Sequence, residues 1–136
     1  ETLKAHEVPD VQQALDLKSH ETLWHLVRYR KMDGRVKIID EDYLSAAIVP
    51  GLNESIALDS LYDYIERQLG LEISYSSKAI TFEAFGDSEY EAFGDVNPPY
   101  TATVRGVVHL KDTTKFQYNI AKHIATEFRF VDFSRR

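Results

Sequence analysis

The run Trp24-His25-Leu26-Val27-Arg28-Tyr29-Arg30 constrains the fold of this 136-residue chain more than any other stretch. It is rich in residues that favour β-strands, and Asp33-Gly34, a strong short-range signal for a β-hairpin, follows it closely. Residues 35–44 are then predicted to return as the partner strand. Because side chains alternate between the faces of a strand, Arg28 and Arg30 are expected to project from the same, partly apolar face.

This arginine pair has two interpretations. An unpaired charge on a half-buried face is costly, so both guanidinium groups need anionic partners. The first interpretation pairs them across the hairpin with Asp40 or Asp42, as is common on sheets. In the second, they grip the phosphate or carboxylate of a ligand. The pattern of residues leaves both interpretations open.

The composition indicates one globular domain, residues 1–136, with 43% hydrophobic and 28% charged residues. The absence of cysteine excludes a disulfide scaffold and a thiolate metal site. No apolar run approaches the roughly 18 residues of a membrane span, and the first residues lack the apolar core of a signal peptide, so a cytoplasmic location is expected. A net charge of -6 makes this chain by itself a poor candidate for binding nucleic acid.

Hydrophobic periodicity predicts an α+β fold, a mostly antiparallel sheet of five to seven strands with helices packed on it. Besides the hairpin, strands are predicted over residues 2–8, 72–85, 100–110, 115–122 and 127–134. Helices are predicted from Pro9 to near Leu17, from Ser55 or Asp59 to Gly70, and over residues 88–93. The apolar stripe of the second helix consists of Leu58, Leu61, Tyr62, Ile65 and Leu69.

Signatures of common catalytic and cofactor sites are absent from the sequence. It has no phosphate-binding glycine loop, no nucleophile elbow and no zinc-binding helix, and its five histidines share no metal-ligand spacing. Asp40-Glu41-Asp42 has two interpretations, a site for a divalent ion or a solvated acidic strand end. We therefore predict no catalytic residue, no metal and no cofactor.

The order of several motifs resembles the UTRA domain, the effector-binding half of GntR/HutC-type bacterial transcription regulators. The matches are an R-x-R-x-x-D-G hairpin at residues 28–34, an S-L-Y-x-x-[IL]-E helix at 60–66, a long strand at 73–82, and a closing hairpin and last strand at 112–118 and 128–130. Residues 30–36, 69–75 and 128–133 are similar more narrowly to the members that control trehalose operons.

The resemblance implies a chorismate-lyase-like fold, a homodimer, and a phosphorylated sugar as effector, trehalose 6-phosphate for the narrower match. It also implies that a winged helix-turn-helix domain precedes this chain in the full protein and binds operator DNA. The acidic charge of this chain is then expected, because operator binding belongs to the other domain.

The resemblance also assigns candidate ligand-binding residues. Arg28 and Arg30 match the arginines with which the family grips its ligands. Tyr75, with Ser74 or Ser77 nearby, is expected on a strand that lines the pocket.

Three further candidates stand on the last two long strands. Gln117 falls where many members have a glutamate, and His123 falls where many have a tyrosine. Both depart from the family pattern but keep a hydrogen-bonding side chain. Arg105 is a candidate from its place in a central strand, with a surface ion pair as the alternative.

Two other classes of function remain open at this point. One is an enzyme of the chorismate-lyase-like fold, since an arginine-lined pocket suits a dicarboxylate and a carboxyl group can act as general acid. The other is a dimerisation module that binds no ligand.

Overall fold

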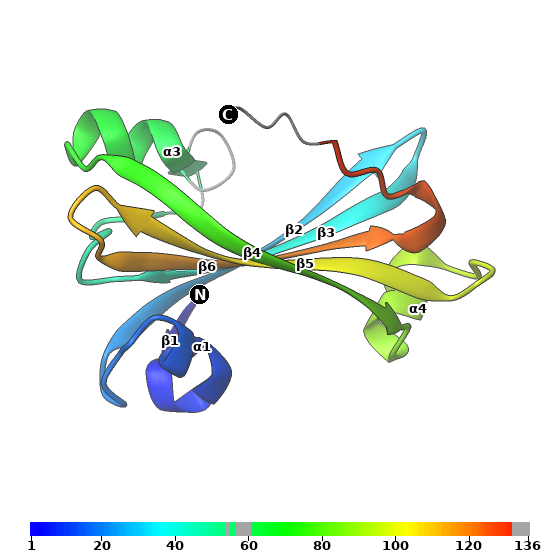
Figure 1. The fold of residues 1–136 in the computed structure, drawn as a ribbon, viewed down its shortest axis with the longest axis horizontal. Coiled ribbons are helices and arrows are strands. Elements are labelled where there is room, and N and C mark those ends of the chain that lie inside the picture. The colour runs from blue at the N-terminus through cyan, green and yellow to red at the C-terminus, as the bar shows by residue number, and fades with distance from the viewer. Residues whose placement is uncertain (54, 57–60, 132–136) are drawn as a thin grey trace, which may run out of the picture.

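An antiparallel sheet forms the body of the protein, as the computed structural model in Figure 1 shows. The structure describes residues 1–53, 55–56 and 61–131. Within them the sheet has six strands in the order β1-β2-β3-β6-β5-β4. Their bounds are β1 (Thr2–Lys4), β2 (Thr22–Met32), β3 (Arg35–Ser45), β4 (Ile73–Ala84), β5 (Tyr100–Leu110) and β6 (Lys115–Ile124). The predicted α+β class with a mostly antiparallel sheet is confirmed.

The predicted hairpin joins β2 to β3. Its two turn residues, Asp33 and Gly34, have φ angles of 54° and 76°. Positive φ at both positions gives a turn whose twist matches that of the flanking strands, and glycine adopts it without steric cost. On its other side β3 pairs with β6, with Asp42 opposite Asn119. The last of these six strands therefore inserts between β3 and β5.

Short helices lie over the two faces of the sheet and at its ends. Their bounds are η1 (Ala5–Glu7), α1 (Pro9–Ala14), α3 (Leu61–Asp63), the π-helical η2 (Tyr64–Gln68), α4 (Asp87–Phe93) and η3 (Ala125–Glu127). Gly70 follows the second predicted helix with a φ of 68°, the left-handed conformation expected after a helix end. None of the helices in the described ranges has the length and apolar character needed to cross a membrane.

The core is divided between the two faces of the sheet. On one face Leu61 and Ile65, from α3 and η2, belong to the same buried cluster as Leu44. On the other face Val11 from α1 belongs to a cluster with Tyr43. Leu44 and Tyr43 are neighbours on β3 and so point to opposite faces. Figure 1 accordingly shows α3 and α1 on opposite sides of the sheet.

The apolar stripe predicted for the helix from Ser55 or Asp59 to Gly70 is buried only in part. Leu61 and Ile65 are buried, whereas 46% of Tyr62 is exposed. Leu58 and Ser60 lie outside the described residues. The exposed ring of Tyr62 borders the site described below.

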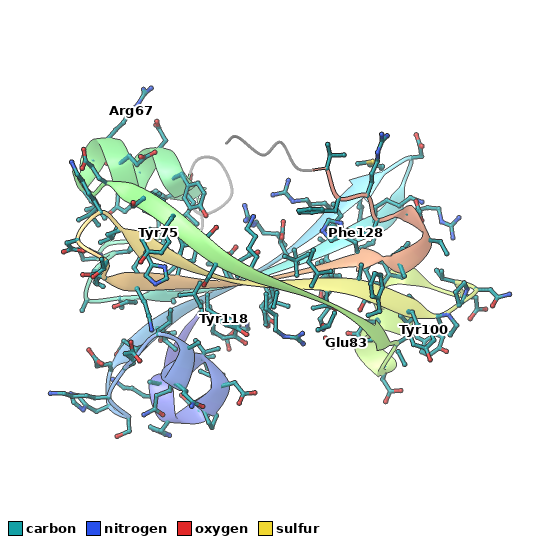
Figure 2. All side chains as sticks on the ribbon, in the orientation of Figure 1. Arg67, Tyr75, Glu83, Tyr100, Tyr118 and Phe128 are labelled. Atoms are coloured by element: carbon teal, nitrogen blue, oxygen red, sulfur yellow. The ribbon has the colours of Figure 1, made fainter. Side chains whose placement is uncertain are left out.

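Two strand predictions need correction. The first strand ends at Lys4 instead of Val8, because the backbone turns into η1. Residues 128–131 form no strand, because η3 turns the chain out of the sheet directly after β6, and these residues line the groove described below instead. Phe128 lies at the side of the sheet, where its ring packs edge-on against His123 at a centroid distance of 5.0 Å (Figure 2). The rest of that prediction, residues 132–134, falls outside the described residues.

Candidate functional site

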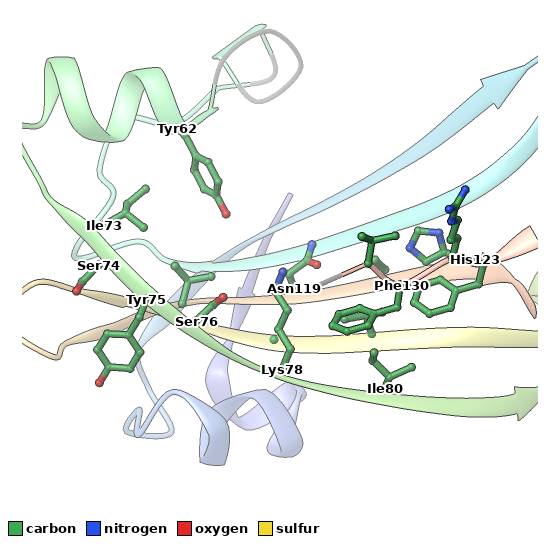
Figure 3. Close-up of a pocket in the computed structure, with 17 residues that line it drawn as sticks. Tyr62, Ile73, Ser74, Tyr75, Ser76, Lys78, Ile80, Asn119, His123 and Phe130 are labelled. Atoms are coloured by element: carbon green, nitrogen blue, oxygen red, sulfur yellow. The ribbon is translucent and has the colours of Figure 1, made fainter. Parts of the chain in front are cut away.

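An open groove of about 800 Å³ lies on the sheet face that carries α3. Residues of β4, β5 and β6 line it, together with Tyr62 and residues 128–131 (Figure 3). Its polar lining consists of Tyr62, Ser74, Tyr75, Ser76, Lys78, Asn119, His123 and Arg129. The volume is in the range usual for small-molecule sites, roughly 300–1,000 Å³.

The two ends of the groove differ in chemistry. Figure 3 shows Tyr62, Ser76 and Asn119 toward one end, and Phe130 and His123 toward the other. A ligand that spans the groove would therefore meet hydroxyl and amide groups at one end and ring surfaces at the other.

The strand register explains why the groove residues share one face. Lys78 pairs with Gly106 in β5, and Gly106 pairs with Asn119 in β6. Asn119 pairs in turn with Asp42 in β3, and Asp42 with Leu26 in β2. Because directly opposed residues in a sheet point to the same side, a single row of positions crosses five strands.

Asp42 is the centre of a hydrogen-bond network beside the groove. Its Oδ1 accepts hydrogen bonds from Gln117 Nε2 at 2.7 Å and Asn119 Nδ2 at 2.8 Å, and its Oδ2 accepts one from Arg28 at 3.1 Å. The hydroxyl of Tyr62 donates to Gln117 Oε1 at 3.0 Å. A carboxylate that is only 1% exposed needs such donors, so the network holds Asn119 and Tyr62 in place at the groove.

The Tyr62 hydroxyl keeps its proton in this setting. Burial, and next the negative charge of Asp42, raise the pKa of Tyr62 above its ordinary value. It is therefore a dependable hydrogen-bond donor at neutral pH.

Both arginines singled out in the sequence are paired with carboxylates of β3. Arg30 Nε donates to Asp40 Oδ2 at 2.6 Å, and Arg28 pairs with Asp42 as described. The structure thus contains the cross-strand pairs of the first interpretation. Neither arginine is among the residues that line the groove, and Arg28 is linked to it through Asp42 and Asn119.

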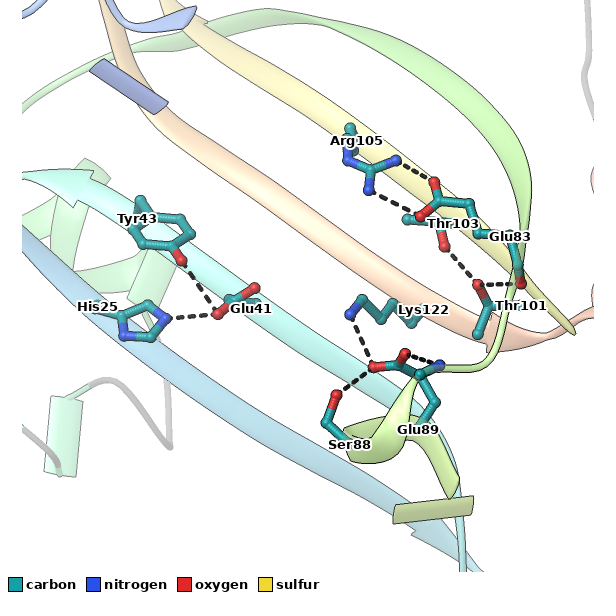
Figure 4. A network of polar contacts seen from close by, with 11 residues as sticks. His25, Glu41, Tyr43, Glu83, Ser88, Glu89, Thr101, Thr103, Arg105 and Lys122 are labelled. Atoms are coloured by element: carbon teal, nitrogen blue, oxygen red, sulfur yellow. Dashed lines mark hydrogen bonds and ion pairs between the residues drawn. The ribbon is translucent and has the colours of Figure 1, made fainter. Parts of the chain in front are cut away.

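The acidic triplet is not the solvated strand end that was the alternative to an ion site. Asp40 and Asp42 are buried with their arginines, while Glu41 points to the opposite face. There Glu41 accepts a hydrogen bond from the Tyr43 hydroxyl at 3.2 Å and lies 2.7 Å from His25 Nε2 (Figure 4). Strand alternation keeps the three carboxylates from converging. Across the described residues, no group of three or more His, Cys, Asp or Glu side chains is placed to hold a metal ion.

The predicted residues of β4 divide between the two faces. Ser74 and Tyr75 border the groove, but the Tyr75 ring points away from it in Figure 3 and stacks on His109 at 4.3 Å. Ser77 is displaced by one position from Ser76, so its side chain belongs to the opposite face. The structure brings Ser76, in place of Ser77, to the groove.

Arg105 also lies on the opposite face, in register with Ala79 of β4. It forms a two-pronged ion pair with Glu83, shown in Figure 4. Hydrogen bonds from Arg105, and next from Thr81, lower the pKa of Glu83 to about 2. Arg105 thus forms the surface ion pair that was the alternative interpretation of this residue. The structure brings neither Arg105 nor Ser77 to the groove.

The two predicted residues of β6 lie on the groove face. His123 lines the groove, and burial lowers the pKa of its ring, which is therefore neutral at pH 7. Gln117 is 2% exposed and belongs to the network around Asp42.

Sequence reasoning missed Ser76, Lys78 and Asn119 as site residues, although a signal for each was present. Ser76 and Lys78 alternate with Ser77 on the predicted strand over residues 72–85. Asn119 lies two residues from Gln117, so strand alternation puts both on one face. The burial of Asp42 had no such signal, because it depends on which strand pairs with β3.

Comparisons with known proteins found similar sequences and similar folds. The family model described as the UTRA domain matches residues 2–129. The HTH-type transcriptional regulator TreR of Bacillus subtilis (strain 168) is 40% identical over 126 residues, which are 93% of this chain and 53% of that protein. The chain spans about half the length of the curated relatives it matches.

Solved structures are similar over nearly the whole chain. The effector binding domain of the B. subtilis trehalose repressor (TreR) matches with a TM-score of 0.82 and 40% identity, over 94% of this chain and 89% of that one. The possible transcriptional regulator YydK from B. subtilis subsp. subtilis str. 168 matches with a TM-score of 0.87, over 99% of this chain and 58% of that one. At 22% identity, the second similarity shows the fold alone.

Proposed function

Because the chain belongs to the UTRA domain family, we propose that its groove binds a phosphorylated sugar, trehalose 6-phosphate, as the effector of a bacterial transcriptional repressor. At the coarser level, the chain is an effector-binding domain of a GntR-type regulator, similar to TreR. The observation that carries the proposal is the open groove of about 800 Å³, with hydroxyl, amide and cationic side chains in its lining, in a domain 40% identical to the effector binding domain of TreR.

The polar end of the groove suits sugar hydroxyl groups. Ser76 offers a hydroxyl that can donate and accept. Tyr62 and Asn119, whose donors are engaged by Gln117, Asp42 and the Glu41 carbonyl, offer the hydroxyl oxygen and the amide oxygen as acceptors. His123 and Phe130 present ring surfaces at the other end, against which the apolar face of a sugar ring can pack. A disaccharide phosphate would use both ends.

The buried network prepares this end for the sugar. Arg28 and Gln117 bind the two oxygens of Asp42, and Asp42 fixes Asn119. A binding group held in advance loses little conformational freedom when the ligand arrives, which favours affinity. In this proposal Arg28 and Gln117 are positioning residues for Asn119.

We expect no catalysis at this site. On the groove face of the described strands, Asp40 and Asp42 are each engaged by an arginine, so neither is free to act as general acid or base. A turnover assay with chorismate tests this expectation, and product formation that depends on Asp42 would contradict it.

The role of the whole regulator follows as part of the same proposal. An N-terminal winged helix-turn-helix domain would bind operator DNA, two copies of the regulator would form a homodimer in the cytoplasm, and the effector would favour one arrangement of that dimer. A ligand shifts such an equilibrium only by its differential affinity for the two arrangements. Operator binding would weaken when trehalose 6-phosphate binds.

Thermal unfolding tests the proposal directly. Trehalose 6-phosphate at about 100 times its dissociation constant is expected to stabilise the chain by roughly 2.7 kcal/mol, whereas trehalose and glucose 6-phosphate at the same concentration stabilise it less. A shift with a different sugar phosphate alone would support the sensor role and show that the effector is that sugar phosphate instead of trehalose 6-phosphate. The absence of a shift with any of them would favour the dimerisation module.

A matched pair of variants places the effect in the groove. Tyr62→Phe removes a hydroxyl at the groove, whereas Tyr90→Phe removes one from α4, a similarly exposed position outside it. We expect Tyr62→Phe to weaken trehalose 6-phosphate binding by about tenfold, the value of one hydrogen bond, and Tyr90→Phe to leave it unchanged. Equal affinities in both variants would contradict the assignment of the groove.

A further inference from the structure

We propose that Lys78 binds the phosphate group of the ligand, and that Gly106 is the residue that positions it. This inference rests on the proposed function and deepens it, because it names the cation that receives the anionic part of the sugar phosphate. The residues that the sequence suggested for this task were Arg28 and Arg30.

The charges on the groove face point to Lys78. Arg28 and Arg30 are each neutralised by a carboxylate of β3. Lys78 lines the groove, and none of the ion pairs formed by the described residues includes it. Its ammonium group therefore adds a positive charge to the groove that no carboxylate of the described chain offsets.

The packing of the Lys78 stem explains how this charge is directed. Lys78 stands opposite Gly106 in the β4–β5 register, and Gly106 has no side chain to fill the space between them. A Cβ atom added to Gly106 would lie 3.3 Å from Cγ and 4.0 Å from Cε of Lys78. The lysine stem thus lies across Gly106, in the direction of Asn119, as Figure 3 shows.

The neighbours of Lys78 complete a site for a phosphate monoester. Ser76 lies two positions along the same strand face, and Asn119 lies in the same row of the sheet, one strand beyond Gly106. A lysine ammonium offers three hydrogen-bond donors, and the Ser76 hydroxyl adds another for the remaining phosphate oxygens, while Asn119 donates to Asp42 and to the Glu41 carbonyl and borders the site.

Arg129 is the competing cation. It also lines the groove and has no carboxylate partner within the described residues, but its neighbours in sequence, Phe128 and Phe130, present apolar rings. The Ser76 hydroxyl, which can share a phosphate with the ammonium group, lies on the Lys78 side (Figure 3). The charge pattern therefore favours Lys78 for the phosphate.

Isothermal titration calorimetry on the chain tests the assignment, with trehalose 6-phosphate and trehalose as probes. Lys78→Met keeps the apolar stem and removes the charge, and Lys18→Met makes the same change at an exposed position outside the groove. We expect Lys78→Met to weaken trehalose 6-phosphate binding by about 10- to 100-fold and to leave trehalose binding unchanged. Lys18→Met should alter neither affinity.

A double-mutant cycle tests the positioning role of Gly106. Gly106→Ala should weaken trehalose 6-phosphate binding when Lys78 is present, because the new methyl group displaces the lysine stem. In the Lys78→Met background the same change should have little further effect on the affinity for trehalose 6-phosphate, since the charge is already gone. Melting temperatures of all variants, measured without ligand, establish that each is folded.

The outcomes separate the two levels of the proposal. If the wild-type chain binds no sugar phosphate, the proposed function fails and this inference fails with it. If the wild type binds and Lys78→Met binds equally well, the proposed function stands and the inference is wrong. A loss seen in Arg129→Met but not in Lys78→Met would also overturn it, in favour of Arg129.

Discussion

Gln117 Nε2 donates a hydrogen bond to Asp42 Oδ1 at 2.7 Å, and both side chains are almost completely buried. The bond joins β6 to β3, two strands from opposite ends of the chain that lie side by side in the sheet. A hydrogen bond to a buried carboxylate is stronger than one between neutral groups, because one partner carries a full charge. This contact therefore contributes to the stability of the sheet as well as to the order of the groove.

Gln117→Leu is expected to destabilise the chain by about 1–3 kcal/mol. The change removes one donor from Asp42 and one acceptor from Tyr62, and an unmet buried polar group costs about that much. Urea denaturation measures the free energy of unfolding. Gln13→Leu, at an exposed position of α1, should change it by no more than about 0.5 kcal/mol, and an equal loss in both variants would contradict the prediction.

Asp42→Asn tests the buried ion pair. The substitution keeps the shape of the side chain but leaves Arg28 without a counter-charge, so we expect a loss of about 2 kcal/mol, below the usual range for buried pairs because Arg28 is 27% exposed. Asp63→Asn is the control, because its pair with Arg67 is at the surface and should contribute less than about 1 kcal/mol. Unfolding in urea compares them, and a stable Asp42→Asn variant would show that the charge is dispensable.

Arg105→Gln should raise the pKa of Glu83 from about 2 toward its ordinary value of 4.5. Because the folded-state pKa of Glu83 is depressed, this pair stabilises the fold above pH 4.5 and the contribution is lost as the pH falls toward 2. Carbon-detected NMR titration of the Glu83 carboxyl measures the pKa in wild type and variant.

Since Arg105 lies on the face opposite the groove, the same variant should bind trehalose 6-phosphate like the wild type. A loss of affinity would indicate that Arg105 takes part in ligand binding, and it would contradict the assignment of the groove face. Glu72→Gln, which alters an exposed ion pair with Lys111, is a control for the loss of one surface charge.

Tyr43→Phe should make the stability of the chain less sensitive to alkaline pH. Burial, together with the nearby charge of Glu41, raises the pKa of Tyr43 from 10.0 to about 12. Because the pKa of Tyr43 is higher in the folded state, the protonated hydroxyl stabilises the fold fully below pH 10, and this contribution is lost as the pH rises through 12. Unfolding in urea between pH 10 and 12 should therefore show a shallower decline for Tyr43→Phe. Tyr29→Phe, at a position 57% exposed, should keep the wild-type slope.

The sequence was sufficient to predict local structure on long, regular strands. The β2–β3 hairpin and its Asp33-Gly34 turn follow from strand-forming residues next to a turn signal, and β5 was predicted with its observed bounds, residues 100–110. Strand alternation correctly put Arg28 and Arg30 on one face of β2, with Asp40 and Asp42 as possible partners across the hairpin, and the observed ion pairs run diagonally between the two strands.

What the sequence did not determine was which strand lies beside which. Over residues 128–131 the predicted strand does not form: η3 turns the chain out of the sheet, in which β6 is already flanked by β3 and β5, and no local pattern contains that order of strands. The same order brings Asn119 to Asp42 and so decides that Asn119 and Lys78, rather than Arg105, belong to the groove face. Site residues that depend on long-range pairing were therefore missed.

The pairing of β3 with β6 also has a consequence for a chain that is still being synthesised. β3 ends at Ser45 and β6 begins at Lys115, so the ribosome releases one long before the other. Until β6 inserts, β3 and β5 each present an open edge, and open strand edges can pair with those of other nascent chains. Insertion of β6 covers both edges and brings Asn119 and His123 to the groove, so the event that joins the strands of the proposed binding site also protects the newly made protein from aggregation.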